Sequence, residues 1–292
     1  MRYFLESIST FAFWRHALFS REAMSNFLAA VGILFLAVQL ADFFAVYTRD
    51  KHSEYGFIFI LGVALLWVLS VRRPLRRVHY KLPSKDCSIE VKIGDLFTEQ
   101  GEVIVSSNTT FDTDMSNGLI SAESLQGQLA LKFFSGNTQE IDRQLEHSLT
   151  GEPFTSRDDA PGKKKEYAPG TVARVSTHGK NFYFVAMSRL NESGTAESSV
   201  KMIEESLEKL WENMAKKAEL GDIIMPLIGT GRGRVALPRN KVVEKIAQSF
   251  VDASRNRTFS NRLKIMIREQ DASRFSVNLF QIKDYLSRSL HT

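Results

Sequence analysis

The chain has 292 residues, of which 43% are hydrophobic and 24% charged, and this composition excludes a disordered chain. It carries 38 Lys and Arg against 33 Asp and Glu; the whole excess lies in residues 1–86, with 11 basic and 6 acidic side chains, whereas residues 87–292 carry 27 of each. A broad basic surface for nucleic acid is therefore excluded, and the one cysteine, Cys87, excludes an intramolecular disulfide and a zinc site built on several cysteines.

Aromatic and basic side chains are mixed in residues 1–25, as in Phe11, Trp14 and Arg15. This mixture is typical of an amphipathic helix that lies on the inner leaflet of a membrane. A short helix that packs on the soluble part of the chain is the alternative.

Two apolar segments follow, residues 26–47 and 55–71, and both are predicted to be transmembrane helices. At 1.5 Å per residue they span about 33 Å and about 26 Å, close to the hydrocarbon thickness of a bilayer. The alternative is a buried helical hairpin of a soluble domain. A cleaved signal peptide is not expected, because a long polar and aromatic segment precedes the first run and no small-residue cleavage site follows it.

Charged residues around these segments predict their orientation. Positive residues are retained on the cytoplasmic side, so both termini are expected in the cytosol. The basic residues that follow the second segment are Arg72, Arg73, Arg76, Arg77, Lys81 and Lys85. Within the first segment, Asp42 either snorkels into the outer interface or makes a polar contact between subunits or in a pore wall.

A basic linker over residues 72–86 is expected to lead into a soluble α/β segment. Predicted strands are 88–93, 102–106, 171–176, 181–187, 222–228 and 262–268, and predicted helices are roughly 121–134, 138–149, 197–219, 239–254 and 276–288. Ser121 and Asn137 are expected N-caps of the first two helices. Strands interleaved with helices indicate a layer sandwich around one sheet, in which ligands bind where the carboxyl ends of strands meet.

The first unusual loop at a strand end is Gly94-Asp95-Leu96. Glycine permits a tight exit from the strand, and the neighbouring carboxylate can accept hydrogen bonds from an exocyclic amine. An aspartate that only caps a turn is the alternative.

The second loop, residues 106–113, is dense in small hydrogen-bonding side chains and leads to a helix start near Ser124, Gln126 and Gly127. A helix start exposes unpaired N–H groups and a partial positive charge, which suits an anion.

The third loop contains Gly229, Thr230, Gly231, Arg232 and Gly233, between a strand and a helix. Without β-carbons, backbone N–H groups can converge on phosphate oxygens. The spacing matches neither the P-loop nor the dinucleotide-binding pattern. We favour phosphate binding by this loop. The alternative is that the loop is only a flexible turn.

These three loops, in this order, resemble those of the macro domain, an ADP-ribose-binding module with a three-layer α/β/α fold around a mixed central sheet. The resemblance covers roughly residues 87–270, and Pro226-Leu227-Ile228-Gly229-Thr230-Gly231 is its most specific part. It implies that Asp95 and Leu96 contact the adenine, that Asn108 lies near the distal ribose, and that residues 229–233 surround the diphosphate.

This sequence differs from most macro domains in two places. Thr109 to Thr113 replace the glycines that follow the asparagine in most macro domains, and residues 108–134 contain no adjacent glutamates. Both departures argue against hydrolase activity. The Asn-x-x-Phe-Asp-Thr and Ser-Leu-Gln-Gly elements, preceded by two apolar segments, are similar to the membrane-bound effectors of type II Thoeris antiphage systems.

That similarity implies a receptor in the bacterial inner membrane. A TIR-domain enzyme would make an ADP-ribose derivative, in this class a histidine-linked one, and the bound macro domains would then assemble as homo-oligomers and damage the membrane. Phe111, Asp112 and Thr113, together with residues 124–127, are hypothesised to contact the group on the distal ribose. Asp112 would pair with an imidazole or amino group there, or would instead cap a turn.

The expected domains are residues 1–25, 26–71, 72–86, 87–270 and a C-terminal helix over 271–292. No catalytic or metal-ligating residue, no cofactor and no nucleic-acid partner is expected. A membrane-tethered ADP-ribosyl hydrolase and a passive tether for ADP-ribosylated partners are the alternative functions. The expected ligand contacts are Asp95, Leu96, Asn108, Phe111, Asp112, Thr113, Ser124, Gln126, Gly127, Gly229, Thr230, Gly231, Arg232 and Gly233.

Overall fold

The computed structural model of the chain contains two compact units, Met1–Leu75 and Arg76–Thr292. The residues it describes are 2–44, 53–83, 85–158, 161–216, 220–229, 237–255, 257–275 and 277–290.

The N-terminal unit is helical. Its helices are α1 (Arg2–Ile8), α2 (Phe11–Phe19), α3 (Arg21–Phe43) and α4 (Ser53–Val71). Thr10 and Ser20 begin α2 and α3 as N-caps, because their side-chain oxygens accept hydrogen bonds from the N–H groups of Phe13 and Ala23. Residues 2–25 therefore form two short helices and the start of a third, where one amphipathic helix was expected over residues 1–25.

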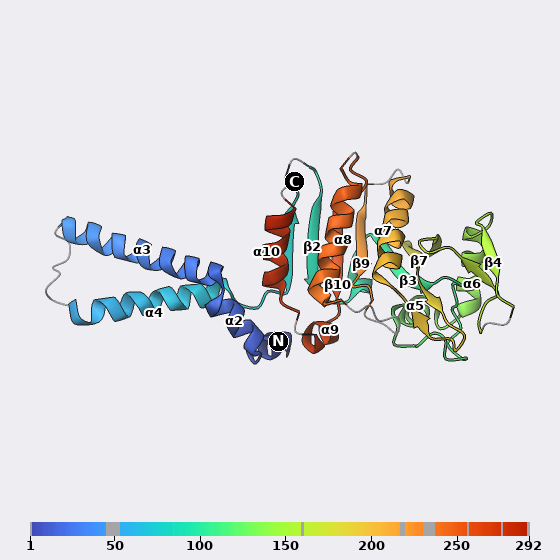
Figure 1. Cartoon of the computed structure of the whole chain (residues 1–292), viewed down its shortest axis with the longest axis horizontal. Coiled ribbons are helices and arrows are strands. Elements are labelled where there is room, and N and C mark those ends of the chain that lie inside the picture. Colours follow the sequence, from blue (N-terminus) through green and yellow to red (C-terminus); the bar gives the residue numbers. More distant parts are fainter. Residues whose placement is uncertain are drawn as a thin grey trace. The chain divides into compact units, whose positions relative to one another are not determined.

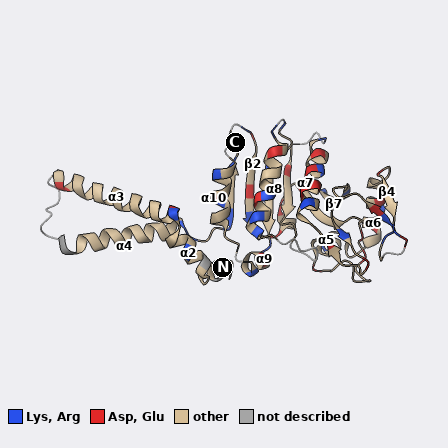
Figure 2. Cartoon of the chain, in the orientation of Figure 1, with Lys and Arg blue, Asp and Glu red and all other residues tan. Residues whose placement is uncertain are grey.

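Helices α3 and α4 lie side by side in this unit (Figure 1) and expose apolar surface. Figure 2 shows them without charge between their ends, since residues 23–41 and 55–71 contain no Asp, Glu, Lys or Arg. Among the described residues, α3 alone is long and apolar enough to cross a membrane, and the apolar part of α4, Tyr55–Val71, is shorter. Phe35 and Leu36 are more than half exposed, and a surface of this kind marks a membrane or protein contact. Membrane insertion of both helices stays a prediction.

Arg72, just after α4, ties the end of that helix to the start of α3. Its guanidinium is buried and lies 3.1 Å from His16 Nε2; it also donates to the His16 carbonyl at 3.2 Å and to Ser20 Oγ at 3.0 Å. The Arg72 guanidinium also forms an ion pair with the Glu22 carboxylate at 3.4 Å. Arg72 is one of the basic residues expected to face the cytosol, but its guanidinium makes its contacts inside the helical unit.

The contact between His16 and Arg72 makes the N-terminal unit sensitive to acid. Burial, together with the charge of Arg72, lowers the pKa of His16 from 6.5 to about 4. An unfolded histidine takes up its proton near pH 6.5, so the stability that neutral His16 supports is complete above that pH and is lost as the pH falls toward 4. We expect amide-exchange protection of α2, corrected for intrinsic rates, to fall over this window and to stay flat in His16→Gln. Equal protection of wild-type α2 at pH 4.5 and 7.5 would refute this.

The second unit is built on a mixed sheet whose strand order is β1-β2-β10-β9-β3-β7-β6. The five strands from β2 to β7 in this order run parallel, and the edge strands β1 and β6 are antiparallel to their neighbours. The strands are β1 (Arg77–Lys81), β2 (Ser88–Ile93), β3 (Glu102–Asn108), β6 (Val172–Thr177), β7 (Lys180–Leu190), β9 (Asp222–Pro226) and β10 (Arg262–Ile267). The short strand β8 (Ala196–Glu197) pairs with β7, and β4 (Phe154–Ser156) pairs with β5 (Lys165–Tyr167).

Helices cover both faces of the sheet. On one face α7 (Val200–Ala215), α8 (Arg239–Ala253) and α10 (Leu279–Ser289) lie side by side (Figure 1). On the other face α5 (Leu125–Phe134) packs on β3, and α6 (Thr138–Ser148) packs on β6. The short helices η2 (Leu96–Thr98) and α9 (Glu269–Arg274) follow β2 and β10. This is the expected three-layer α/β/α fold with a mixed sheet.

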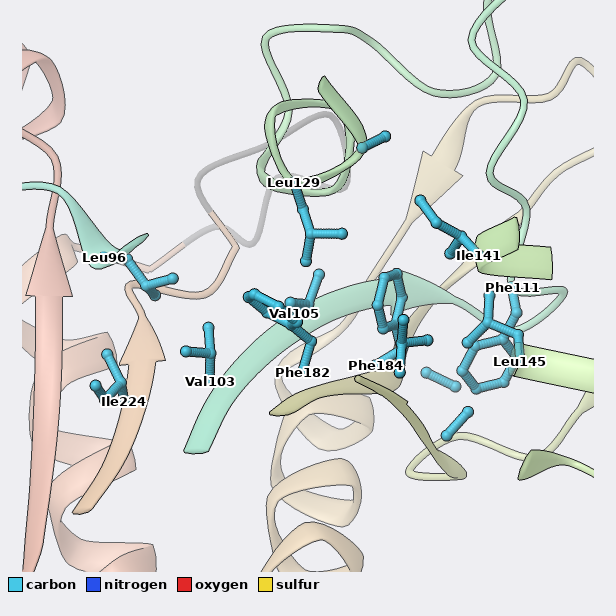
Figure 3. Close-up of a cluster of buried hydrophobic side chains, with 14 of the residues drawn as sticks. Leu96, Val103, Val105, Phe111, Leu129, Ile141, Leu145, Phe182, Phe184 and Ile224 are labelled. Carbon is cyan, nitrogen blue, oxygen red and sulfur yellow. The ribbon is translucent and has the colours of Figure 1, made fainter. Parts of the chain in front are cut away.

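Alternation along β3 and β7 divides the core between the two faces. Val103, Val105, Phe182 and Phe184 join Leu129 and the α6 side chains in one buried cluster (Figure 3). Trp211, Phe250 and Phe259 form an aromatic cluster at the helices of the other face. Because successive residues of a strand point to opposite faces, one strand supplies both cores.

Several predicted boundaries need correction. Residues 77–81, expected in a linker, form β1. Helix α5 begins at Leu125, and Ser124 is its N-cap where Ser121 was expected, because the Ser124 side chain accepts a hydrogen bond from Gly127 N. No strand was predicted between residues 149 and 171, but this segment contains the β4–β5 ribbon. Asn137 caps α6 as predicted.

Candidate functional site

A cavity of about 210 Å³ opens where the five parallel strands end. Strands β10, β9, β3 and β7 contribute residues to its wall, as does Gly94 directly after β2, and the start of α5 closes one side. The lining is Gly94, Leu96, Ser106, Ser107, Asn108, Leu119, Ile120, Ser121, Ser124, Leu125, Gln126, Met187, Ser188, Leu190, Ala196, Ser198, Ile203, Pro226, Leu227, Ile228, Gly229, Met266, Arg268 and Asp271. Ligands of open α/β sheets bind at this edge, so the cavity is the candidate site.

The start of α5 reaches the cavity through Ser124, Leu125 and Gln126. Ser124 Oγ accepts the Gly127 N–H at 3.0 Å, while the first-turn N–H groups of a helix have no partner inside it. A β-carbon on Gly127 would lie 2.3 Å from the Ser121 carbonyl oxygen. Glycine is therefore needed to let the preceding turn approach the helix and form this wall.

Asp95 lies between two lining residues, Gly94 and Leu96, but is not itself in the lining. Its Oδ1 accepts the Phe97 N–H at 3.0 Å as the cap of η2, and its Oδ2 lies 2.7 Å from Lys132 Nζ. Burial acts to raise the pKa of Asp95, but the hydrogen bonds from Lys132 and Phe97 and nearby positive charges outweigh it, so the pKa is lowered. Asp95 thus stays ionised at neutral pH, and its remaining lone pairs can accept a further hydrogen bond.

The turn after β3 is held by its own buried side chains. Asp112 is 2% exposed and accepts on both oxygens: from Lys163 N at 2.7 Å on Oδ1, and from Asn108 Nδ2 at 3.2 Å and Thr110 Oγ1 on Oδ2. Asn108 Oδ1 in turn accepts from Asp112 N at 3.0 Å and from Thr110 at 3.1 Å. The Lys163 ammonium donates to the Phe111 carbonyl at 2.8 Å. Asp112 therefore acts as a turn-forming carboxylate.

Phe111 points away from the cavity. Its backbone has a φ of 50°, in the left-handed region that bulky residues seldom adopt. The ring is 1% exposed, packs edge-on against Tyr167 at 5.6 Å, and lies beside Ile141 and Leu145 in the core (Figure 3). The unusual backbone thus turns an aromatic ring from a polar loop into the hydrophobic cluster.

The glycine-rich loop reaches the cavity through its first glycine. Gly229 has a φ of 71° and lines the wall with Leu227 and Ile228. Arg239, in the first turn of α8, donates to the Gly229 carbonyl at 2.9 Å. Thr230, Gly231, Arg232 and Gly233 lie outside the described residues, so their predicted contacts with phosphate stay predictions.

The structure brings together part of the predicted site. Predicted residues in the lining are Leu96, Asn108, Ser124, Gln126 and Gly229. Those outside it are Asp95, Phe111, Asp112, Thr113 and Gly127. Sequence reasoning missed Ser188 near the end of β7 and Arg268 and Asp271 just beyond β10, although the rule that ligands bind at strand ends points to them. No group of three or more His, Cys, Asp or Glu that could hold a metal occurs among the described residues.

With this fold and site described, the comparisons identify the family. The family model of the macro domain of Thoeris protein ThsA matches residues 89–268, more than half of the chain. The chain belongs to this macro-domain family. A curated relative, Thoeris protein ThsA of Bacillus amyloliquefaciens strain Y2, is 21% identical over 206 residues, which cover 68% of each chain.

A solved structure supports the fold. A mutant of the Oceanobacillus iheyensis macrodomain is 17% identical with a TM-score of 0.50, and the match covers 74% of this chain and 100% of that one. The same macrodomain with ADP is 18% identical with a TM-score of 0.49 and the same coverage. The resemblance inferred from the three loops is therefore confirmed for family and fold.

Proposed function

We propose that this ThsA-type chain is a membrane-anchored receptor of Thoeris antiphage defence whose cavity binds an ADP-ribose-derived signal. The observation that carries the proposal is that Gly94, Asn108 and Gly229, from the three loops singled out in the sequence, line one cavity. The start of α5 joins them there and offers helix N–H groups to an anion.

The spacing of the strands supports an extended ligand. Gly94 follows β2 and Gly229 lies beyond β9, and β10 separates the two strands. Neighbouring strands lie about 4.8 Å apart, so a purine held near Asp95 and a diphosphate held by the glycine-rich loop are separated by about 10 Å along the sheet edge. The lining continues past β9 to β3 and β7, which leaves room for a sugar and a group attached to it.

Two features favour a receptor over a membrane-tethered hydrolase. The amide oxygen of Asn108 already accepts from Thr110 Oγ1 and from Asp112 N, so neither of its two lone pairs is free to accept a hydrogen bond from a water molecule. Among the described lining residues the one carboxylate is Asp271, and Arg268 Nε binds it at 2.9 Å. Incubation with an ADP-ribosylated protein tests this point, because steady release of ADP-ribose would replace the receptor proposal with the hydrolase.

The N-terminal helices are proposed to span the bacterial inner membrane, with both termini in the cytosol, and to respond there to ligand binding by the macro domain. The uncharged stretches of α3 and α4 support insertion. Binding would favour an assembled state, as a ligand does when it binds one state better than the other. Vesicles loaded with dye and carrying the full chain should then leak when the ligand is added. Binding without leakage or assembly would support a passive tether.

The signal itself is proposed to be a histidine-linked ADP-ribose made by a TIR-domain enzyme. Its identity is open to direct measurement: the full chain is purified in detergent from cells that express a partner TIR enzyme, and small molecules released from it are analysed by mass spectrometry. We expect a compound with the ADP-ribose fragment that is absent when the TIR enzyme is inactive. A copurifying compound without an adenosine diphosphate fragment would contradict the proposal.

A further inference from the structure

The part of the sheet formed by β1, β2 and β10 presents charged side chains on the face that α5 and α6 cover elsewhere. Those two helices pack on β3 and β6. The register pairs Arg77 with Lys92, and it pairs Lys81 with Ser88. The same serine is paired with Arg262 on β10. Because paired residues of neighbouring strands point to the same side of a sheet, the four basic side chains form one surface, called here the basic face.

The acidic side chains of this surface lie beneath the basic ones. The Glu90 side chain is 3% exposed, and its carboxylate lies 2.8 Å from Arg77 and 3.3 Å from Arg262. The Glu99 side chain is 12% exposed and pairs with Lys92 at 2.6 Å. Arg77 and Lys92 are the more exposed partners, at 56% and 38%. The outermost charges of the surface are therefore positive.

Positive charge is also in excess on this surface. Lys81 is exposed and has no ion-pair partner in the part of the chain that the structure describes. Lys264 of β10 is largely buried and pairs with Glu99 and Asp222, each at 3.1 Å. The surface and its ion-pair partners thus comprise five basic and three acidic groups: Arg77, Lys81, Lys92, Arg262 and Lys264 against Glu90, Glu99 and Asp222. An exposed excess of this kind attracts an anionic partner.

The length of the chain favours an anionic membrane as that partner. Val71 ends α4 and Arg77 begins β1, so six residue steps separate the proposed membrane helix from the basic face. Six steps extend at most about 20 Å, and the negative potential of a cytoplasmic leaflet attracts basic residues held near its surface. Nucleic acid is another polyanion, but residues 87–292 carry 27 basic and 27 acidic side chains and offer no broad basic surface to it.

We propose that the basic face binds the anionic headgroups of the cytoplasmic leaflet and so holds the macro domain on the membrane in one orientation. This inference rests on the membrane anchoring in the proposed function, and it is independent of the ligand that the cavity binds. The helices α7, α8 and α10 lie on the other face of the sheet and would have no contact with the lipid.

The test labels the amines of the full chain in lipid nanodiscs and quantifies each modified lysine by mass spectrometry. Discs of phosphatidylglycerol mixed with phosphatidylcholine are compared with discs of phosphatidylcholine alone. We expect Lys81 and Lys92 to react about threefold more slowly, or slower still, in the anionic discs, and to lose this protection in about 0.5 M NaCl, because salt screens exposed charges. Lys283 is the internal control. It is exposed on α10, which packs on the other face of β1, so its rate should be equal in both discs.

Lys81→Glu reverses one charge of the basic face without breaking an ion pair. Each basic residue near an anionic surface strengthens the contact by about fivefold, so this variant should lose most of the Lys92 protection and keep the wild-type Tm in neutral discs. Lys201→Glu is the matched control, because Lys201 is 85% exposed on α7. It should leave the protection of Lys92 unchanged.

Fast labelling of Lys81 and Lys92 in both kinds of disc would overturn the inference while the anchoring stands. Slow labelling in both would also overturn it, because another protein surface would then cover the face. Equal protection of Lys283 would show only general nearness to the membrane, which contradicts a contact by one face. A chain that does not enter the discs would overturn the anchoring together with the inference, and binding of ADP-ribose in the cavity would still stand.

Discussion

Replacing Gly127 by alanine is expected to lower the free energy of unfolding by about 2–3 kcal/mol, because the new β-carbon has no room. It would lie 2.3 Å from the Ser121 carbonyl oxygen and 2.7 Å from the Ala122 Cα, and both are backbone atoms that cannot rotate away. The turn must move, and with it the Ser124 cap and the α5 wall of the cavity. ADP-ribose affinity should therefore fall by tenfold or more.

Thermal unfolding and titration of the full chain in detergent measure both effects of Gly127→Ala. A loss of 2–3 kcal/mol corresponds to a Tm lower by about 5–10 °C for a domain of this size. Gly221→Ala is the matched control, because no atom lies within 4 Å of a β-carbon there and its φ is not left-handed. Equal Tm values for the two variants would show that the approach of the turn to α5 is looser than described.

Asp112→Asn is expected to lower the free energy of unfolding by about 2–4 kcal/mol, although the side chain keeps its shape. Both carboxylate oxygens accept, Oδ1 from Lys163 N and Oδ2 from Asn108 and Thr110. An amide must therefore point its NH₂ group at a donor, whichever way it is oriented. The loss should appear without ligand, since Asp112 lies outside the cavity lining.

Asp114→Asn is the control for Asp112→Asn, because Asp114 is exposed and its Oδ1 accepts from Ser116, a contact that an amide oxygen can keep. Its Tm should stay within about 1–2 °C of wild type, since surface substitutions rarely exceed 0.5 kcal/mol. If Asp112→Asn keeps the wild-type Tm and loses only affinity, Asp112 contacts the ligand after all. That outcome would restore the hypothesis that it pairs with an imidazole or amino group.

Short runs of β-branched residues predicted most of the sheet. Strand 88–93 has the observed bounds, and the other predicted strands overlap those found. Strand β1 was missed because Arg77 and Lys81 make it look like a basic juxtamembrane linker. Charged side chains are common on an edge strand, where one side of the backbone has no partner. Helix α9 was missed because six mostly polar residues carry too little periodicity to detect.

The site was predictable where it depends on strand ends and not where it depends on long-range contacts. The three loops meet because parallel strands end at one edge, a rule that needs no coordinates. The roles of Phe111 and Asp112 depend on a left-handed backbone and on Lys163, a residue 51 positions away in sequence. Neither partner can be read from the sequence of the loop itself, so the structural contacts of the ring and the carboxylate could not be predicted.

The proposed function requires that the cavity at the ends of the parallel strands bind the ADP-ribose unit. Calorimetric titration of the full chain with ADP-ribose tests it most directly, in wild type beside Asp95→Ala and Gly231→Glu. We expect saturable binding at one site per chain in wild type and none in either variant. Asp95→Ala loses the acceptor for the adenine amine, and Gly231→Glu brings bulk and negative charge to the predicted phosphate loop. Wild-type affinity in both variants, or no heat of binding in wild type, would contradict it.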